Sequence, residues 1–516
     1  SGKRSRGPVP RLPPPRTGIL ACTMGKDEQA DSPAGLSAGR RVGLDDRVQI
    51  WRDAAVVLGG APWGVLRIAP AARPFVRRLR QAGPAGLLPS PGVEQSVADI
   101  LLRRGIVHPL RVHDRDAGSV PTVEVVIPAY ERPESLDACL SALTASAPLV
   151  RVIVVDDGST TAAVAEVAHA HGATLIRHPS NRGPAAARNT GLAMTSAPIV
   201  AFVDADCAVT PGWLGPLVAH FKDPRVVAVA PRIRPRSNSK ALLPRYERSR
   251  SALDMGPRPE LVAAGSALGY LPSATLLVRR NTLQHLMFDE EMRVGEDVDL
   301  IWRILEDGGM VRYEPASTVT HEVRRRWIDW AGRHFAYGTS AAVLDSRHPR
   351  RLAPARLTAL NLAIVLLVLA RRPYAAVGAA GVSTALLARR LRATAVDPVV
   401  APIVVGKGAL AETLAVGHLL RREWWPLGWL ALAMAPRSRI ARFAAASMLV
   451  PLTQEWLRRR PGVDPVRYTA LHLIEDAAYG SGVITGAIRR RRPGVLLPRV
   501  RLPRTARRGR SIRPVD

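Results

Sequence analysis

From Thr122 onward, short apolar runs alternate with segments whose apolar residues have helical spacing. The runs are apolar at consecutive positions, which is typical of strands buried on both faces, and helices between such strands favour parallel pairing. We therefore expect an α/β domain with a Rossmann-like, mostly parallel sheet covered by helices on both sides. In order, the expected elements are a strand in VEVVIPAY that ends at Pro128, then Ser135–Ser146, Val150–Val155, Thr160–His171, Thr174–Arg177, Pro184–Thr195 and Ile199–Val203.

Residues 42–112 have a different pattern, which predicts a small domain of their own. Strand-like runs come first and helical spacing follows, an order typical of a winged-helix-like domain. The pattern resembles the peptide-binding domains that deliver precursor peptides to tailoring enzymes, although an ordinary structural cap fits it too. Residues 113–121 are expected to be a linker. The runs are Val48–Trp51, Ala54–Leu58 and Gly64–Ile68, and the helical segments are Ala71–Ala82 and Val93–Arg104.

The last third of the chain is rich in Ala, Leu and Val, and we expect an apolar helical region over residues 355–488. Its uncharged stretches Leu357–Ala370, Pro373–Ala388 and Trp424–Pro436 are 14, 16 and 13 residues long. Each is shorter than the roughly 20 residues that span a bilayer, so interfacial, re-entrant, short-spanning and buried helices all fit. Trp and Arg around the third stretch are typical of a membrane surface, but a helical domain packed on itself explains the pattern as well.

The positive charge is concentrated in the first and last segments of the chain. The 516 residues carry a formal net charge of +30, and half of it, +15, lies in residues 1–41 and 489–516. We expect a disordered tail at 1–41 and a basic tail at 489–516. The remainder is only moderately basic, so charge alone does not indicate a nucleic-acid-binding protein. An anionic membrane surface or phosphate-bearing ligands explain it equally well.

The cysteines and the first residues of the chain indicate the cellular compartment. Cys22, Cys139 and Cys207 are far apart, which excludes a disulfide framework and a CxxC zinc site. The first residues are basic and Pro-rich without an apolar run, so no cleavable signal peptide is expected. These features predict a cytoplasmic protein, at the inner face of the cell membrane if the C-terminal region binds lipid.

Four polar clusters follow one another along the alternating region: DDGS at 156–159, RN at 188–189, DAD at 204–206 and ED at 296–297. Each alone has an ordinary explanation, since DDGS is a good turn sequence and acids are favoured in the first turn of a helix at 296–307. All four in this order are much harder to obtain by chance. Because ligands bind beyond the carboxyl ends of parallel strands, the clusters predict one site at that edge.

The combined pattern resembles family-2 glycosyltransferases of the GT-A fold. It reads VVIPAYER…VVDDGST…NRGPAAARNTGL…AFVDADC…GEDVDLIWRI and belongs to a domain expected at residues 122–345. The resemblance implies an inverting enzyme with a nucleotide-sugar donor and a divalent cation, Mg²⁺ or Mn²⁺. A cation is chemically reasonable, because the nucleotide diphosphate gains negative charge as the glycosidic bond breaks.

The resemblance assigns metal and donor roles to individual residues. It makes Asp206 the direct metal ligand, with Asp204 reaching the ribose or the metal. His321 matches a position that supplies a third metal ligand in related enzymes, although a lone His is more often structural. The implied uracil pocket contains Pro128, Tyr130 and Asp156, with Asp157 adjacent, and Arg188 is expected to face the donor.

The ED cluster contains the expected catalytic carboxylate. A sugar hydroxyl is a poor nucleophile until its proton is removed, so the acceptor side needs a general base. Asp297 matches the family's base, and Glu296 is expected to shape the acceptor pocket. Processive cellulose-type synthases carry QxxRW, whereas HEVRRRW preserves only Arg326 and Trp327. Long-chain processivity is therefore not expected, but short oligomers are compatible with the motif.

Within the family, the order of segments resembles the mycofactocin-system glycosyltransferases: a small N-terminal domain, the DDGST/DAD/GED core, HPRRLAP and an apolar, Arg-rich C-terminus. This resemblance implies transfer of glucose from UDP-glucose to premycofactocin, a peptide-derived redox cofactor, with a short β-1,4-glucan as product. The motifs specify neither glucose nor that acceptor. A membrane-associated enzyme that acts on a polyprenyl phosphate or a cell-wall glycan is the alternative.

Two other classes of protein fit less well. A sugar-1-phosphate nucleotidyltransferase needs a Gly-rich phosphate loop after the first strand, and VVIPAYERPE contains none. A nucleic-acid-binding winged helix needs a basic recognition stripe with interleaved aromatic residues, which residues 42–112 lack. Nucleic acid is therefore not an expected partner.

Overall fold

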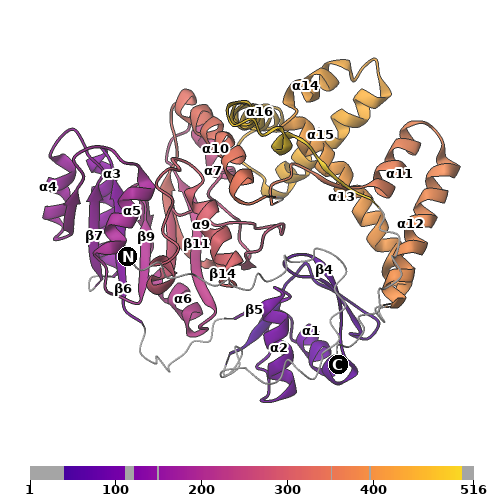
Figure 1. Cartoon of the computed structure of the whole chain (residues 1–516), viewed down its shortest axis with the longest axis horizontal. Coiled ribbons are helices and arrows are strands. Elements are labelled where there is room, and N and C mark those ends of the chain that lie inside the picture. Colours follow the sequence, from indigo (N-terminus) through magenta and orange to yellow (C-terminus); the bar gives the residue numbers. More distant parts are fainter. Residues whose placement is uncertain (1–39, 111–120, 148–149, 350, 394–396, 503–516) are drawn as a thin grey trace, which may run out of the picture. The chain divides into compact units, whose positions relative to one another are not determined.

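The computed structural model describes residues 40–110, 121–147, 150–349, 351–393 and 397–502. Nearly all of the expected tail at 1–41 and linker at 113–121 lies outside the described residues, as does the end of the basic tail, 503–516. The described residues form two compact units, one within 1–112 and 391–397 and the other within 113–390 and 398–516. The second unit contains the large sheet and most of the C-terminal helices (Figure 1).

Four parallel strands form one half of the large sheet, in the order β8-β7-β6-β9. Their chain order reverses at β6, which lies between β7 and β9, and ligands bind at such a point beyond the carboxyl ends of the strands. The strand expected at Ile199–Val203 is confirmed without change. The strands are β6 Val123–Ala129, β7 Arg151–Asp156, β8 Thr174–Arg177 and β9 Ile199–Val203.

The other half of the sheet is mixed. β13 (Thr275–Arg279) pairs antiparallel with both β9 and β11 (Val226–Arg236), and β11 pairs parallel with β14 (Met310–Glu322). Two short strands, β10 (Cys207–Val209) and β12 (Glu260–Leu261), pair antiparallel with β14. Figure 1 shows β7, β6, β9, β11 and β14 in this order across the domain. The arrangement is the GT-A fold that the sequence predicts.

Helices cover both faces of the sheet, because successive strand residues point to opposite sides. On β6, Val125 and Ile127 belong to one buried cluster and Val126 to the other, and all three are fully buried. The first cluster includes residues of α3, α4 and α6, and the second includes residues of α5, α8, α9 and α10. The bounds are α3 Pro133–Ser146, α4 Ala163–Ala170, α5 Pro184–Ala193, α6 Leu214–Val218, α7 Leu242–Ser249, α8 Arg280–Leu283, α9 Glu296–Glu306 and α10 Trp327–Arg347.

Helix α4 begins later than the expected start at Thr160. The backbone N–H of Thr160 donates to Glu131 Oε1 at 2.9 Å, and the Ser159 N–H donates to Asp156 Oδ1 at 2.9 Å. Thr160, the expected first residue of the helix, therefore belongs to the turn after β7. The two hydrogen bonds hold this turn at the edge of the sheet.

The C-terminal third is helical, but it contains more helices than the uncharged stretches predict. One of the additional helices, α13, forms with its preceding turn a 24-residue segment, Pro398–Arg421, that is long and apolar enough to cross a membrane. Lys407 and Glu412 interrupt its uncharged run. This segment lies outside the three uncharged stretches, so the pattern did not mark it. The helices are α11 Ala359–Leu369, α12 Pro373–Ala393, α13 Ala401–Arg421, α14 Trp425–Met434, α15 Arg439–Arg459 and α16 Pro465–Arg489.

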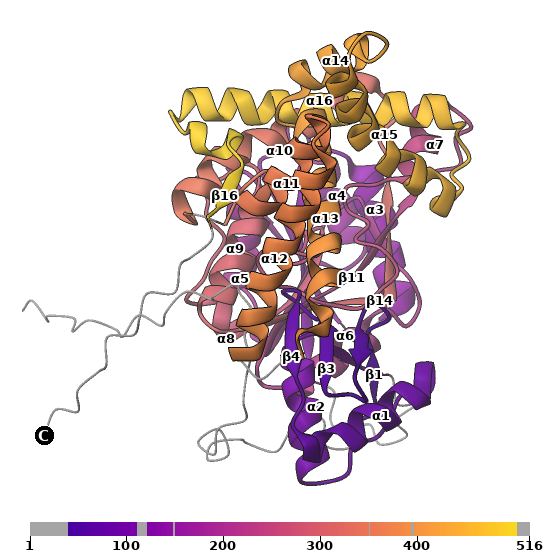
Figure 2. The same cartoon turned by 90° about the vertical axis from the view of Figure 1, so that its right-hand side faces the viewer.

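Helices α10 and α16 join the catalytic domain to the C-terminal helices, and Figure 2 shows α16 crossing α10. A Cβ at Gly338 of α10 would overlap the carbonyl oxygen of Tyr479, and a Cβ at Gly482 of α16 would overlap that of Phe335. The two backbones therefore meet where only glycine fits. Beyond α16, the expected basic tail contains one ordered strand, because β16 (Arg499–Arg501) pairs parallel with β15 (Arg356–Thr358).

The smaller unit has a three-stranded antiparallel sheet, β2-β3-β4, followed by two helices that share its core. A separate strand pair, β1-β5, connects the two ends of this segment. Its winged-helix-like, peptide-binding character stays a prediction. The bounds are β1 Val42–Leu44, β2 Gln49–Trp51, β3 Val56–Gly59, β4 Gly64–Arg67, α1 Arg73–Ala82, α2 Val93–Arg103 and β5 Val107–Pro109.

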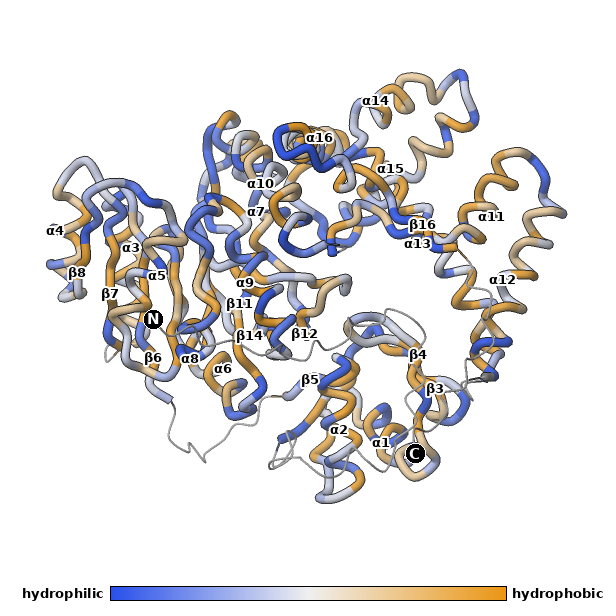
Figure 3. The backbone as a smooth tube through the Cα atoms, in the orientation of Figure 1, coloured by the Kyte–Doolittle hydropathy of each residue, from blue (hydrophilic) through white to orange (hydrophobic). Residues whose placement is uncertain are grey.

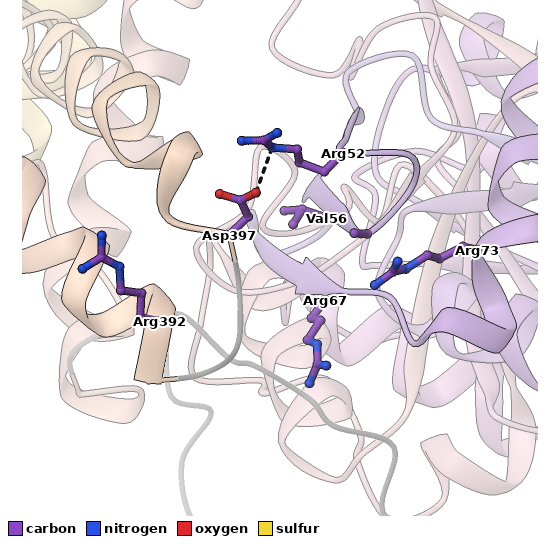
Figure 4. A pocket seen from close by; sticks show the side chains of 7 residues that line it. Arg52, Val56, Arg67, Arg73, Arg392 and Asp397 are labelled. Carbon is purple, nitrogen blue, oxygen red and sulfur yellow. Dashed lines mark ion pairs between the residues drawn. The ribbon is translucent and has the colours of Figure 1, made fainter.

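A hollow of about 400 Å³ in the smaller unit is lined by arginines (Figure 4). Arg52, Arg67, Arg73 and Arg392 lie around it, and Arg52 Nε is 2.8 Å from Asp397 Oδ2. None of the predicted catalytic, donor-binding or metal residues is among the lining residues, and all of them lie in the larger unit.

Candidate active site

Arg188 connects three of the four polar clusters. It lies on α5 and is only 3% exposed. Its Nη1 donates to Glu296 Oε1 at 2.9 Å, and its Nη2 donates to Asp204 Oδ1 at 2.7 Å. The side chain therefore ties the DAD turn after β9 to the first turn of α9, and the predicted clusters meet at one edge of the sheet.

The surroundings of Arg188 keep its guanidinium group charged. Burial alone lowers the pKa of a guanidinium, but the carboxylates of Asp204 and Glu296 outweigh this effect and raise the pKa of Arg188. Its guanidinium carbon is 5.4 Å from the centre of the Phe288 ring. In the described part of the chain, its Nε has no hydrogen-bond partner. A fixed cation thus lies beside Asp204, and its predicted contact with the donor stays a prediction.

Asp297 lies in the first turn of α9, where two backbone N–H groups hold its carboxylate. Oδ1 accepts from Val298 N at 2.8 Å and Oδ2 accepts from Ser273 N at 3.2 Å. Burial raises the pKa of Asp297, although these N–H groups and Arg188 act in the opposite direction. A carboxylate with a raised pKa binds a proton more strongly, which suits a general base.

Glu296 is the buried neighbour of the proposed base and is 7% exposed. Burial, followed by the negative charge of Asp297, raises the pKa of Glu296 to about 7 even though Arg188 lowers it. Its hydrogen bond to Arg188 directs the carboxyl group toward the DAD turn. Glu296 thus helps to hold Arg188, and its expected place in the acceptor pocket stays a prediction.

Asp206 and His321 are brought together by the sheet. The register of β10 and β14 places Cys207 opposite His321, so Asp206 at the start of β10 lies with its Oδ2 3.3 Å from His321 Nε2. Burial would raise the pKa of Asp206, but His321 and the cation of Arg132 outweigh it and lower the pKa to about 2. Burial also disfavours a charged His321, yet the hydrogen bond to Asp206 raises its pKa.

The predicted three-ligand metal site is only partly assembled. Asp206 and His321 adjoin, whereas the Asp204 carboxylate is paired with Arg188. Among the described residues, no group of three or more His, Cys, Asp or Glu side chains is arranged to hold a metal ion. The Asp206–His321 pair offers a carboxylate oxygen and an imidazole nitrogen, a donor set that suits Mn²⁺ better than Mg²⁺, which prefers oxygen alone.

The two carboxylates of the DDGS turn have different surroundings. Asp156, at the end of β7, is fully buried, and its Oδ1 accepts from the Ser159 hydroxyl at 2.5 Å. Its Oδ2 has no hydrogen bond within the described residues, although Arg177 Nε lies 3.3 Å away. Asp157 instead accepts from the backbone N–H groups of Arg182 and Gly183, at 2.9 and 2.7 Å. Asp157 therefore holds the loop before α5, whereas Asp156 Oδ2 can still accept a hydrogen bond from another group.

The remaining predicted donor residues lie where β6 ends. Pro128 pairs with Val155 of the neighbouring strand, and Tyr130 follows β6 with 48% of its surface exposed. An exposed ring at the carboxyl end of β6 is accessible to a ligand, and the uracil contact of both residues stays a prediction.

Several residues at this edge were not predicted from the sequence. Tyr270 lies in the loop before β13 and Tyr337 lies on α10, and burial, with a smaller contribution from the negative charge of Asp297, raises the pKa of both. No motif marks them, because they come from two segments that only the folded chain brings together. Ser159 was part of the DDGS pattern, but its hydroxyl bond to Asp156 could not be read from the turn sequence.

Comparison with known proteins agrees with this geometry. The family model described as "Glycosyl transferase family 2" matches residues 124–284. The pre-mycofactocin glycosyltransferases of two Mycobacterium tuberculosis strains, CDC 1551 and H37Rv, are each 36% identical over 481 residues, 90% of this chain and 99% of theirs. The chain belongs to glycosyltransferase family 2. It is a glycosyltransferase of the same family as these mycobacterial relatives.

More distant relatives align with only part of this family-2 glycosyltransferase. The succinoglycan biosynthesis protein ExoU of Rhizobium meliloti is 30% identical over 236 residues, 42% of this chain and 66% of its own. A GalNAc-T7 structure solved with UDP, GalNAc and Mn²⁺ is 20% identical, with a TM-score of 0.32, over 40% of this chain and 44% of its own. S. aureus TarS is 18% identical, with a TM-score of 0.33, over 43% and 39%.

Proposed function

We propose that the enzyme transfers glucose from UDP-glucose to pre-mycofactocin with inversion and builds a short β-1,4-glucan. The observation that carries the acceptor is the extent of similarity to the pre-mycofactocin glycosyltransferases, 90% of this chain and 99% of theirs. That extent includes the C-terminal helices and the small N-terminal unit. ExoU, a succinoglycan biosynthesis protein, matches only 42% of the chain and does not bear on the acceptor.

Asp297 is proposed to remove the proton of the acceptor hydroxyl. The hydroxyl oxygen then forms a bond to the anomeric carbon, the bond from that carbon to the diphosphate oxygen breaks, and UDP leaves with the electron pair. Burial raises the pKa of the partly exposed Asp297, and a carboxylate with a raised pKa binds the abstracted proton more strongly, which supports this role. Glu296 and Arg188 hold the adjoining turn in place and keep Asp204 oriented.

A divalent cation is proposed to be held by Asp206 and His321, with Asp204 as a third group. The support is the 3.3 Å distance between the carboxylate of Asp206, directly before β10, and the ring of His321 on β14. When bound, the cation supplies positive charge to the diphosphate leaving group. Asp204 is paired with Arg188, so its carboxylate has to be shared between the arginine and any cation.

The uracil ring is proposed to lie against Pro128 and Tyr130. The Asp156 Oδ2 oxygen, which lacks a hydrogen bond among the described residues, is the proposed acceptor for the ring N–H. Arg177 Nε lies 3.3 Å from this oxygen without forming a hydrogen bond, so a base that carries an N–H would add the hydrogen bond that the buried oxygen lacks. Asp157 supports the site through its hydrogen bonds to the backbone of the loop before α5.

The test is a transfer assay with the full chain. Purified protein is incubated with pre-mycofactocin, Mn²⁺ and each of UDP-glucose, UDP-galactose, UDP-N-acetylglucosamine and GDP-mannose, and products are read by mass spectrometry. We expect successive additions of single hexoses with UDP-glucose only, and loss of product with a chelator. Asp297→Asn is the matched control for catalysis. Transfer to a polyprenyl phosphate but not to pre-mycofactocin would contradict the proposed acceptor.

We further propose that the enzyme works at the cytoplasmic face of the membrane, on an anionic lipid surface. Hydrophobic residues are frequent along α11–α14 (Figure 3), and several large apolar side chains there are more than half exposed. The segment Pro398–Arg421 is only 17% buried within its most apolar window. Exposed apolar side chains on this scale are typical of surfaces that contact a membrane. Examples are Leu366, Val377, Leu410, Leu427 and Leu430.

A further inference from the structure

The HPRRLAP segment begins at His348, the residue at which helix α10 ends. Pro349 follows, and the residue before a proline is disfavoured in the α conformation, so the helix stops here. The backbone N–H of His348 donates to the Leu344 carbonyl oxygen at 2.8 Å, which fixes the residue to the last turn of α10. His348 is only 4% exposed. It is therefore a buried titratable group to which the proposed reaction assigns no role.

Both ring nitrogens of His348 face carboxylates of α9. Nε2 lies 3.0 Å from Asp299 Oδ1, and Nδ1 lies 3.0 Å from Glu306 Oε1. An ionised carboxylate has no proton to donate, so each ring nitrogen has to supply the proton for its own hydrogen bond. An imidazole with a proton on both nitrogens is the charged imidazolium. The two contacts therefore require His348 to bind α9 as a cation.

The charges around His348 favour this cation. Burial alone lowers the pKa of His348, but the hydrogen bonds to Asp299 and Glu306 outweigh burial and raise the pKa. Asp299 is 1% exposed, and burial would raise its pKa, but His348 and Arg303 outweigh this effect and lower it. Each of the two carboxylates has an arginine as a further partner. The other charged groups that face this cluster are Arg303 and Arg347 at Asp299, Arg351 at Glu306, and Asp289 at Arg347.

The contact between His348 and Asp299 lies at the start of α9, close to the proposed base. Asp299 is two residues beyond Asp297, in the first turn of the helix. Gly295, directly before the helix, has a φ of +84°, and a Cβ there would be only 2.9 Å from the Cβ of Ser340 on α10. The start of α9 therefore contacts α10 at Gly295 and, through His348, at Asp299. Because these two contacts lie on either side of Asp297 in the chain, they set the position of its turn.

We propose that His348 is a positioning residue for the proposed base: as an imidazolium it ties the first turn of α9 to the end of α10 and keeps Asp297 in place beside the acceptor hydroxyl. The inference rests on the proposed function, in which Asp297 takes the acceptor proton. His348 acts through Asp299 and exchanges no proton with the substrates. When the pH rises through the raised pKa of His348, the ring loses one proton and one of its two hydrogen bonds, and turnover falls.

The experiment compares His348→Gln with His171→Gln, a matched control. His171 also ends a helix, α4, and its Nε2 lies 2.8 Å from the carboxylate of Asp137 on the neighbouring helix α3. Three measurements are made on the full chain between pH 6 and pH 9. They are kcat and KM for transfer to pre-mycofactocin, the rate of acceptor-independent UDP-glucose hydrolysis, and the Kd and stoichiometry of UDP binding with Mn²⁺ in calorimetry.

We expect kcat and the hydrolysis rate of His348→Gln to be about ten- to hundredfold lower at pH 6.5, because a displaced reactive group lowers the rate of the chemical step. KM and the UDP Kd should stay within about twofold, and the UDP stoichiometry should not change. The wild type and His171→Gln should both lose turnover toward pH 9. His348→Gln should lack this alkaline fall, because glutamine does not titrate.

Glu306→Gln is a second and milder test, because the Glu306 side chain is 45% exposed. Loss of one of the two carboxylates that stabilise the charged ring should move the alkaline fall of kcat to lower pH by about one unit. This variant decides the question if His348→Gln does not fold. Unchanged kcat in a folded His348→Gln, or an alkaline fall at the wild-type pH in Glu306→Gln, would overturn the positioning role. A UDP stoichiometry that falls in step with kcat in both variants would show loss of folded enzyme and overturn it too.

The hydrolysis assay separates this inference from the proposed acceptor. If the wild type leaves pre-mycofactocin unmodified, but its hydrolysis of UDP-glucose shows the His348-dependent alkaline fall, the acceptor is wrong and the positioning role stands. If the wild type modifies pre-mycofactocin and His348→Gln matches it at every pH, the positioning role is wrong and the proposed function stands.

Discussion

Replacing Arg188 with leucine should destabilise the protein in a pH-dependent way. Arg188 is 3% exposed and donates to both Glu296 and Asp204, so the substitution leaves two carboxylates without their shared cation. Glu296 is 7% exposed and feels the loss fully, whereas the Asp204 side chain is 31% exposed and is partly solvated. The main cost therefore comes from Glu296.

The magnitude depends on the protonation of Glu296. Removing one partner of a buried ion pair costs about 3–5 kcal/mol when the remaining group stays charged. When that group is protonated, the loss is closer to that of a hydrogen bond to a charged group, about 1.5–3 kcal/mol. The pKa of Glu296 is already about 7, so the group is largely neutral at pH 5 and largely charged at pH 8. We expect losses of about 2 kcal/mol at pH 5 and about 4 kcal/mol at pH 8.

The sign follows from proton binding. The folded-state pKa of Glu296 lies above its ordinary value of 4.5, so between those values the folded protein binds more protons than the unfolded chain and loses stability as pH rises. Without the arginine, the pKa of Glu296 rises further and this loss extends to higher pH. Asp297, whose pKa burial also raises, faces the same cation and shifts in the same direction.

Urea denaturation at pH 5, 6.5 and 8 measures the effect on the free energy of unfolding. Arg188→Lys is one control, because a single ammonium keeps a charge but cannot reach both carboxylates in the same way. The double variant Arg188→Leu/Glu296→Gln is the other, and it should recover part of the loss and flatten the pH dependence. A destabilisation that is equal at pH 5 and pH 8 would refute the reasoning.

Four further predictions follow from the same structure. Asp297→Asn should lower transfer about 10²- to 10⁴-fold and leave UDP affinity unchanged in calorimetry, since only the proton acceptor is lost; near-normal turnover would remove Asp297 from that role. Asp206→Ala should weaken Mn²⁺-dependent UDP binding, and an unaltered metal dependence would make the DAD segment merely a strand end. Gly482→Val should lower the Tm by several degrees, because its Cβ overlaps the Phe335 carbonyl oxygen; an unchanged Tm would show that the helix crossing adjusts freely. Leu427→Glu with Leu430→Glu should reduce sedimentation with anionic vesicles at low salt, and full binding of this variant would place the membrane contact elsewhere.

Most of the catalytic domain could be predicted from local pattern. A strand buried on both faces has to be apolar at consecutive positions, and a covering helix has to repeat every three or four residues. The expected Val150–Val155 and Ser135–Ser146 therefore correspond to β7 and α3, at Arg151–Asp156 and Pro133–Ser146. Helix α13 was missed, because its charged residues interrupt the uncharged run that the pattern relies on.

Two adjacent aspartates show what the local sequence pattern cannot predict. Asp156 and Asp157 are chemically identical in the sequence, yet one leaves an oxygen without a hydrogen bond in the described part of the chain and the other holds the backbone of Arg182 and Gly183. The difference arises because β7 ends at Asp156, so that the next side chain points the other way, toward the loop before α5.

The sequence by itself determined the order of strands and helices, the family pattern and the residue types that can hold a donor, a cation and a proton, because each of these depends on neighbours in the chain. Only the tertiary structure decided which of them meet. The register of β10 and β14 brings Asp206 to His321, Arg188 bridges Asp204 and Glu296, and the glycine crossing of α10 and α16 brings the Tyr479 carbonyl against Gly338. Such contacts depend on strand register and helix packing between distant segments, which hydrophobic periodicity does not encode.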